Sequence, residues 1–75
     1  MIKATYSVLK YYEYENWYIV KDAETAYFPS YKAAIILIAR WNSCYDWMYV
    51  INKVEETQEN AEWHPDVLHY KHLWE

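Results

Sequence analysis

The amino-acid sequence predicts an α+β fold in which a small antiparallel β-sheet of three or four strands packs against one main α-helix. Residues 2–14 alternate with the period of a strand, and residues 31–44 form an apolar segment behind a helix-capping serine. Strand-forming residues then return at 47–55. The expected order is β-β-(β)-α-β followed by a C-terminal helix or strand. A chain of 75 residues accommodates this as a single domain, residues 1–75.

The first half of the chain contains the expected sheet strands. The more apolar face of the first strand is formed by Ile2, Ala4, Tyr6 and Val8. A tight turn at Glu15 and Asn16 predicts that the chain returns as a second strand at 17–21. A turn over 22–24 then favours a short third strand at 25–28.

The helix prediction rests on its start and on its apolar side chains. Ser30 follows a proline and is a preferred N-cap residue. The stripe expected to face the sheet consists of Ala33, Ile36, Leu37, Arg40, Trp41 and Cys44. Because the first half of this helix is apolar nearly all round, we expect a second cover, either the C-terminal segment or another subunit.

The last third of the sequence is less regular. The 47–55 segment carries apolar residues on both faces, which favours a central strand. Residues 55–64 are expected to form an acidic, loosely helical connection. The tail, 65–75, fits either a helix or a strand by spacing, and Pro65 followed by Asp66 favours a helix.

Aromatic and acidic residues dominate the composition. Ten tyrosines, five tryptophans and one phenylalanine exceed what so small a core can bury, and Tyr and Trp are common at binding hot spots. The formal net charge is −4, from 7 basic and 11 acidic residues. The acids concentrate in a stretch without Lys or Arg that holds Glu55, Glu56, Glu59, Glu62 and Asp66. That distribution argues against a protein that binds nucleic-acid phosphates.

The sequence offers little for catalysis or metal binding. It has no glycine, so a Gly-rich phosphate loop is absent. His64, His69 and His72 could attract a metal, but structural zinc normally takes four ligands, and the only thiol, Cys44, is distant in sequence. We expect surface histidines, a buried and inert cysteine, no cofactor, no metal and no enzymatic activity.

Targeting signals are also not evident. Met1 leads directly into the strand pattern, without the apolar run of a signal peptide. The longest apolar stretch, residues 33–39, is too short to span a bilayer. A single cysteine forms no internal disulfide. We therefore expect a cytoplasmic protein, in the host cytoplasm if it is viral.

These features favour a non-enzymatic protein-binding module. A specific hypothesis is an inhibitor from a phage or mobile element, of the anti-CRISPR or anti-restriction type, that acts on a host nucleic-acid-processing complex. Its partner would be a host protein with a basic surface; binding to a membrane or directly to nucleic acid is not expected. The predicted acidic, aromatic-rich surface comprises Tyr11, Tyr18, Tyr49, Glu55, Glu56, Glu59, Glu62, Trp63 and Asp66.

Two other functions and one simpler interpretation stay open. A sheet platform for single-stranded RNA or DNA would use Tyr11, Tyr18 and Tyr49 with Lys3, Lys10 and Lys21. A homodimeric structural or scaffold protein would cover the apolar helix with a second copy. The simpler interpretation of the acidic run is a solvated connection between elements.

Overall fold

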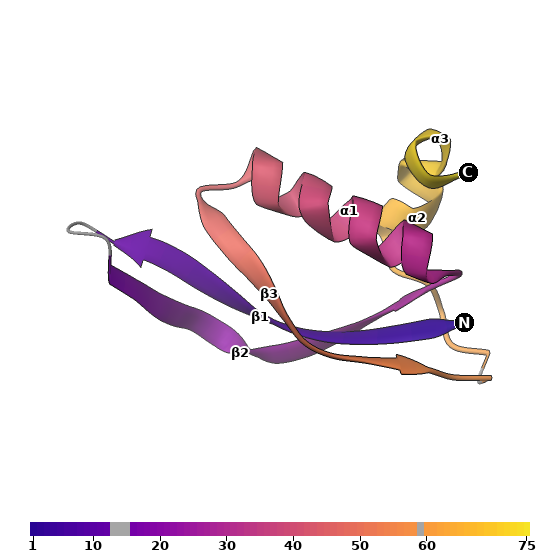
Figure 1. The fold of residues 1–75 in the computed structure, drawn as a ribbon, viewed down its shortest axis with the longest axis horizontal. Helices are drawn as coiled ribbons and strands as arrows, with labels where there is room; N and C mark the ends of the chain where they lie inside the picture. Colours follow the sequence, from indigo (N-terminus) through magenta and orange to yellow (C-terminus); the bar gives the residue numbers. More distant parts are fainter. Residues whose placement is uncertain (13–15, 59) are drawn as a thin grey trace.

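The fold is a three-stranded antiparallel sheet with one main helix on one face, which confirms the predicted α+β class (Figure 1). A computed structural model describes residues 1–12, 16–58 and 60–75, without the side chains of residues 11, 12 and 16. The strand order is β2-β1-β3. The elements are β1 (Ile2–Tyr12), β2 (Asn16–Phe28), α1 (Tyr31–Cys44), β3 (Trp47–Glu56), α2 (Pro65–His69) and α3 (Lys71–Trp74).

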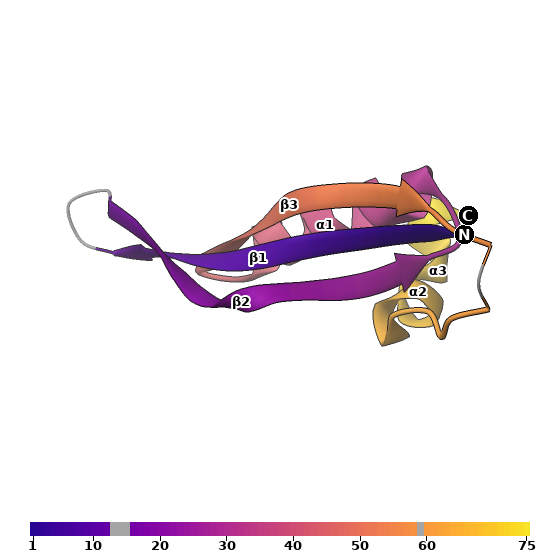
Figure 2. The ribbon, with the colours of Figure 1, turned by 90° about the horizontal axis from the view of Figure 1, so that it is seen from below.

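Strand β1 is the centre of the sheet and supplies much of the core. Its predicted apolar face is confirmed, since Ile2, Ala4, Tyr6 and Val8 are all buried. The alternate residues lie on the opposite face, which we call the open face because no described helix covers it (Figure 2).

Strand β3 is an edge strand, so the prediction of a central position is wrong. Thr5 of β1 pairs with Lys53, whereas the next β1 residue, Tyr6, pairs with Ile51. Asn52 is therefore an extra residue, a β-bulge. The extra residue moves the side chains that follow it to the opposite face of the sheet. The apolar residues of this strand therefore occupy both alternating positions in the sequence, although only one face of the strand is covered.

Strand β2 is continuous, and the predicted turn over 22–24 with a separate third strand is wrong. The pairing with β1 shifts twice, between the partners of Tyr6 and Val8 and between those of Val8 and Leu9. Each shift adds one residue to β2. The polar segment 22–24 therefore lies in a bulged part of the strand and does not form a turn. The predicted turn at Glu15 lies outside the described residues.

Helix α1 begins as predicted. The Oγ of Ser30 accepts a hydrogen bond from the backbone N–H of Ala33 at 3.2 Å, which satisfies a donor in the first turn. The side chains that face the sheet and core are Ala33, Ala34, Leu37, Ile38 and Trp41. Cys44 was expected among them but is exposed, because the helix ends at this residue.

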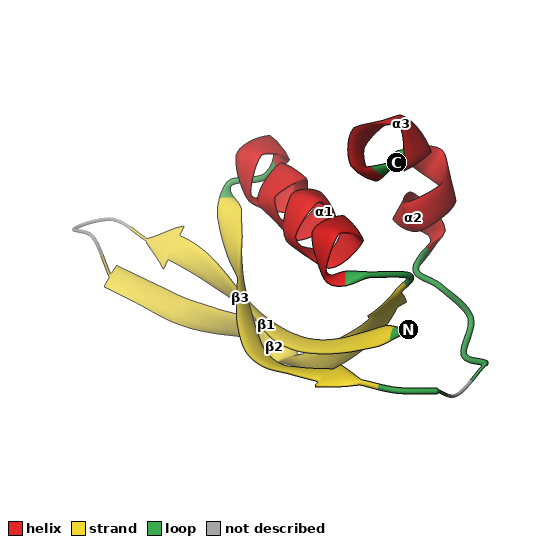
Figure 3. Cartoon of the chain, turned by 45° about the vertical axis from the view of Figure 1, so that its right-hand side comes forward, coloured by secondary structure: helices red, strands yellow, loops and turns green. Residues whose placement is uncertain are grey.

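The C-terminal segment provides the second cover of α1 (Figure 3). The tail is helical, as favoured, although Tyr70 interrupts it and separates α2 from α3. Val67 is completely buried in the core, and the guanidinium carbon of Arg40 lies 4.3 Å from the centre of the Tyr70 ring. Of the two expected covers, the chain uses its own tail, while Ile35 stays 62% exposed on α1.

Different helices lie beside different strands of the sheet. In Figure 2, α1 runs behind β1 and β3, whereas α2 and α3 lie on the side of β2. The preceding segment reaches β2 directly, since the backbone N–H of His64 donates to the carbonyl of Tyr27 at 3.0 Å. The described residues of the 55–64 connection form no helix, contrary to expectation. No helix in the described part of the chain is long and apolar enough to cross a membrane.

Candidate functional site

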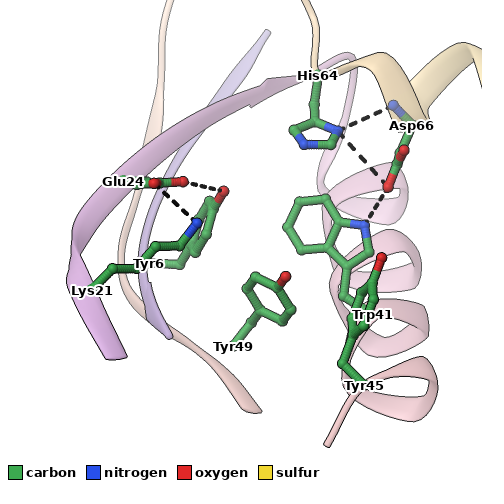
Figure 4. Close-up of a pocket in the computed structure, with 8 residues that line it drawn as sticks. All are labelled: Tyr6, Lys21, Glu24, Trp41, Tyr45, Tyr49, His64 and Asp66. Atoms are coloured by element: carbon green, nitrogen blue, oxygen red, sulfur yellow. Dashed lines mark hydrogen bonds and ion pairs between the residues drawn. The ribbon is translucent and has the colours of Figure 1, made fainter. Parts of the chain in front are cut away.

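A cavity of about 270 Å³ opens beside β2, where the cover of the sheet passes from α1 to α2 (Figure 4). Every major element contributes to its wall. The lining residues are Tyr6, Lys21, Glu24, Trp41, Tyr45, Tyr49, His64 and Asp66. Tyr6 and Trp41 are buried and form the floor, whereas Lys21, Glu24 and Tyr45 are exposed and form the rim.

The floor and one wall consist of aromatic rings in mutual contact. The ring centres of Trp41 and Tyr49 lie 5.0 Å apart, and each lies 5.6 Å from the Tyr6 ring. The His64 ring adds a fourth member, 4.7 Å from Trp41. The interplanar angles are between 52° and 62°, which suits the attraction between ring edges and ring faces. The rings thus support one another in a fixed arrangement.

A carboxylate on β2 organises one side of the cavity. Glu24 accepts a hydrogen bond from the Tyr6 hydroxyl at 3.3 Å and forms an ion pair with Lys21 at 3.0 Å. The hydrogen bond from Lys21 lowers the pKa of Glu24. Burial, followed by the charge of Glu24, raises the pKa of Tyr6 to about 12. At neutral pH the Tyr6 hydroxyl is therefore a hydrogen-bond donor and not a base.

A second carboxylate lies on the opposite side. The indole Nε1–H of Trp41 donates to Asp66 Oδ2 at 2.6 Å, and the backbone N–H of Asp66 donates to His64 Nδ1 at 3.1 Å. Burial lowers the pKa of His64, although Asp66 and Glu24 act in the opposite direction. The ring is neutral at pH 7, and because Nδ1 accepts a hydrogen bond, its proton is on Nε2.

The charges of the cavity do not cancel. Lys21 and Glu24 neutralise each other, and His64 is neutral, so the carboxylate of Asp66 leaves one negative charge. Rings combined with a surplus carboxylate are suited to recognising a small cationic group. Within the described part of the chain, no three His, Cys, Asp or Glu residues lie together as metal ligands would.

An exposed apolar run lies on β2 directly before the cavity residues. It consists of Trp17, Tyr18, Ile19 and Val20, which we call the hairpin patch. The strands that carry it extend beyond the end of α1 (Figure 1). Ile19 is 65% exposed, more than the other three. Four consecutive large apolar residues on an exposed strand are uncommon unless another surface covers them.

The predicted aromatic residues are only partly brought together. Tyr49 lines the cavity and Tyr18 belongs to the hairpin patch. Trp63 is 41% exposed in the segment before α2. The side chain of Tyr11 lies outside the described part of the structure.

The predicted acidic residues are dispersed. Asp66 lies in the cavity, whereas Glu55 lies on the open face, 2.6 Å from Lys53 and 3.8 Å from Lys3. Glu56 and Glu62 are exposed. Glu59 lies outside the described residues. The fold and its ion pairs therefore separate Glu55 from Asp66.

The proposed nucleic-acid platform is likewise divided between faces. Tyr18 pairs with Lys10 and Tyr49 pairs with Val8, which places both tyrosines on the α1 side of the sheet. Lys3 lies on the open face. A stacking surface with these rings beside all three predicted lysines does not form.

Sequence reasoning missed most of the cavity. Tyr6 was recognised only as a core residue, and Trp41 only as part of the helix stripe. Glu24 lies at the cavity because it pairs with Tyr6, and Lys21 lies there because of a β2 bulge, which no sequence motif indicates. His64 was considered only as a metal ligand.

The other two histidines flank Tyr70 on different helices, with His69 at the end of α2 and His72 in α3. Both side chains are exposed, as expected.

Comparison of the chain with models of known protein families, with curated proteins and with solved structures gives no match. Its function must therefore be argued from geometry and charge.

Proposed function

We propose that this chain is a non-enzymatic protein-binding module that engages a basic surface of another protein. The observation that carries the proposal is the continuity of β2. Its exposed apolar residues, 17–20, lead directly to Lys21 and Glu24 in the cavity wall. Tyr18 lies on the cavity side of the sheet, whereas Ile19 pairs with Leu9 on the open face. A partner that wraps around the edge of β2 would therefore contact both faces of the patch and reach the cavity.

The composition of this surface supports binding. Trp and Tyr supply large contact areas and have polar atoms at their tips, and they are enriched at binding hot spots. The hairpin patch presents one of each beside two aliphatic residues, and the cavity rim adds the exposed ring of Tyr45. Apolar anchors beside a partly polar cavity are the usual composition of a protein interface.

The irregular edge of β2 favours contacts through side chains over the addition of a strand. Two bulges interrupt the pairing between residues 19 and 24. Bulges twist an edge strand and disrupt the regular ladder on which an incoming strand would form hydrogen bonds. Farther along, the edge is already occupied at Tyr27 by the backbone of His64.

Charge favours a basic protein as the occupant. The chain has a formal net charge of −4, and the cavity has one surplus carboxylate. A basic partner would be attracted by both, and its association would accelerate at low salt. A second copy of the chain would add a further four negative charges, which disfavours self-association through this surface.

Proteins that process nucleic acids present basic grooves, and they form the specific partner class that we propose. On this proposal the chain is an inhibitor of the type carried by phages and mobile elements, and it acts in the host cytoplasm. The binding surface is the hairpin patch with the cavity. It replaces the row of carboxylates, because Glu55 is already engaged by Lys3 and Lys53.

Two exposed isoleucines provide a matched test. Ile19 in the hairpin patch is 65% exposed and Ile35 on the outer side of α1 is 62% exposed, so aspartate at either position should leave the fold intact. The tagged chain is used to recover its partner, and dissociation constants are measured with the purified partner and with purified nucleases. Ile19→Asp should weaken binding by about tenfold or more, the effect of a hot-spot residue, and Ile35→Asp by less than about twofold.

Several outcomes would contradict the proposal. Equal losses in the two variants, or a loss in Ile35→Asp alone, would place the interface elsewhere. Affinity that does not fall with increasing salt would remove the argument for a basic partner. Quenching of tryptophan fluorescence by single-stranded oligonucleotides would indicate direct nucleic-acid binding instead.

A further inference from the structure

We infer that the cavity beside β2 is a receptor for a single cationic side chain, an arginine or a lysine, supplied by the protein partner. The inference rests on the proposed function and specifies the contact at the centre of that interface. The cavity has eight lining residues and a volume of about 270 Å³. That volume is just below the range of small-molecule sites, roughly 300–1,000 Å³, and is suited to one inserted side chain.

The aromatic rings at the cavity are placed where a bound cation could contact them. In Figure 4, the rings of Tyr6 and Trp41 lie on either side of the Tyr49 ring. The ring centres of these residues are 5.0–5.6 Å apart, so they form a continuous aromatic wall. The electron-rich face of a tryptophan or tyrosine ring attracts a cation placed within about 6 Å of its centre.

Two carboxylates also line the cavity. Glu24 and Asp66 come from different elements and approach the cavity from opposite sides (Figure 4). Lys21 compensates the first at 3.0 Å, whereas the second is contacted within the cavity by the neutral donor Trp41 and the neutral ring of His64. Arg40, which does not line the cavity, also interacts with the charge of Asp66. A bound cation would be attracted by the carboxylate of Asp66, whereas an anion would be repelled by it.

The chain already shows this mode of recognition elsewhere. The guanidinium of Arg40 on α1 lies over the Tyr70 ring, 4.3 Å from its centre. There the cation and the ring both belong to the chain. At the cavity the rings and the carboxylates are present, and the nearest basic side chain, Lys21, lies at the exposed rim.

The test uses a capped amino acid and so does not require the partner. N-acetyl-arginine methylamide is titrated into the whole chain, and the indole Nε1–H resonance of Trp41 is followed by NMR. N-acetyl-leucine methylamide and inorganic phosphate serve as the comparison ligands. We expect saturable shifts with the arginine compound in the millimolar range and no saturation with the other two.

Two lysines provide the matched variants. Lys21→Ala removes a positive charge at the cavity, and Lys53→Ala removes one on the open face, where it pairs with Glu55 at 2.6 Å. Lys21→Ala should tighten binding of the arginine compound by about fivefold, and Lys53→Ala should change it by less than about twofold. Asp66→Asn keeps an acceptor for the indole but removes the charge, and should weaken binding by a similar factor.

Saturation by phosphate or by the leucine compound would overturn the inference, as would unchanged binding in Lys21→Ala and Asp66→Asn. Equal tightening in both lysine variants would show only a response to net charge, and would also overturn it. If the arginine compound fails to bind while Ile19→Asp still abolishes partner binding, the proposed function stands and the cavity inference falls. The opposite pattern would retain the cavity and reject the proposed surface.

Discussion

Replacing Asp66 by alanine should destabilise the fold by about 1.5–3 kcal/mol, because it removes a hydrogen bond to a charged acceptor and leaves a donor in the core unsatisfied. The bond from the Trp41 indole is short, 2.6 Å, and the tryptophan is only 5% exposed. It joins α1 to the start of α2. In a domain of 75 residues such a loss should lower the Tm by about 6–24 °C.

A double-mutant cycle isolates this bond from the other effects of each change. Trp41→Phe, Asp66→Ala and the double variant are unfolded with urea and followed by far-UV circular dichroism, which reports mainly the backbone. The coupling energy should be about 1.5–3 kcal/mol. Trp63→Phe is the control, since Trp63 is 41% exposed, and it should stay within about 0.5 kcal/mol of the parent. A coupling energy below about 0.5 kcal/mol would refute the role assigned to this bond.

Three further predictions concern single groups. Burial lowers the pKa of His64 below its usual 6.5, so the unfolded chain takes up a proton first as the pH falls, and stability should decrease below about pH 6.5. His64→Asn should flatten that decrease between about pH 7.5 and pH 5.5 in urea titrations, and an unchanged slope would assign it to other groups. The pKa of Tyr6 is raised to about 12, so stability should fall as the pH rises above about 10, and Tyr6→Phe should remove the last tyrosine transition in absorbance at high pH. If that transition persists in the variant, another tyrosine is responsible. Ser30→Ala should cost about 0.5–2 kcal/mol by removing the N-cap of α1, whereas Ser43→Ala, at the exposed end of the helix, should cost less.

Local signals in the sequence were sufficient for the buried face of β1 and for the start of α1. The alternation around Ala4 and Tyr6 predicts the buried face of β1, and Ser30 predicts the start of α1. Both features depend on neighbouring residues only. The order of the strands and the continuity of β2 were missed, because β-bulges depend on pairing between distant segments.

The candidate site was harder to predict for the same reason. Trp41 and Asp66 are 25 residues apart in sequence, and their hydrogen bond exists only once α2 packs beside α1. Glu24 reaches Tyr6 only because β1 and β2 pair over 18 residues of sequence separation, and Lys21 joins it through the altered register of β2. Composition and charge drew attention to Tyr49 and Asp66, which both line the cavity, but they could not show that Glu55 would be neutralised on the open face.

The most direct test of the central claim is backbone hydrogen exchange of the chain with and without its purified partner. If the hairpin patch and cavity form the interface, exchange should slow most over residues 17–24, with a smaller effect at Tyr45 and Asp66. Protection confined to the outer side of α1 around Ile35, or to residues 56–62, would contradict the account.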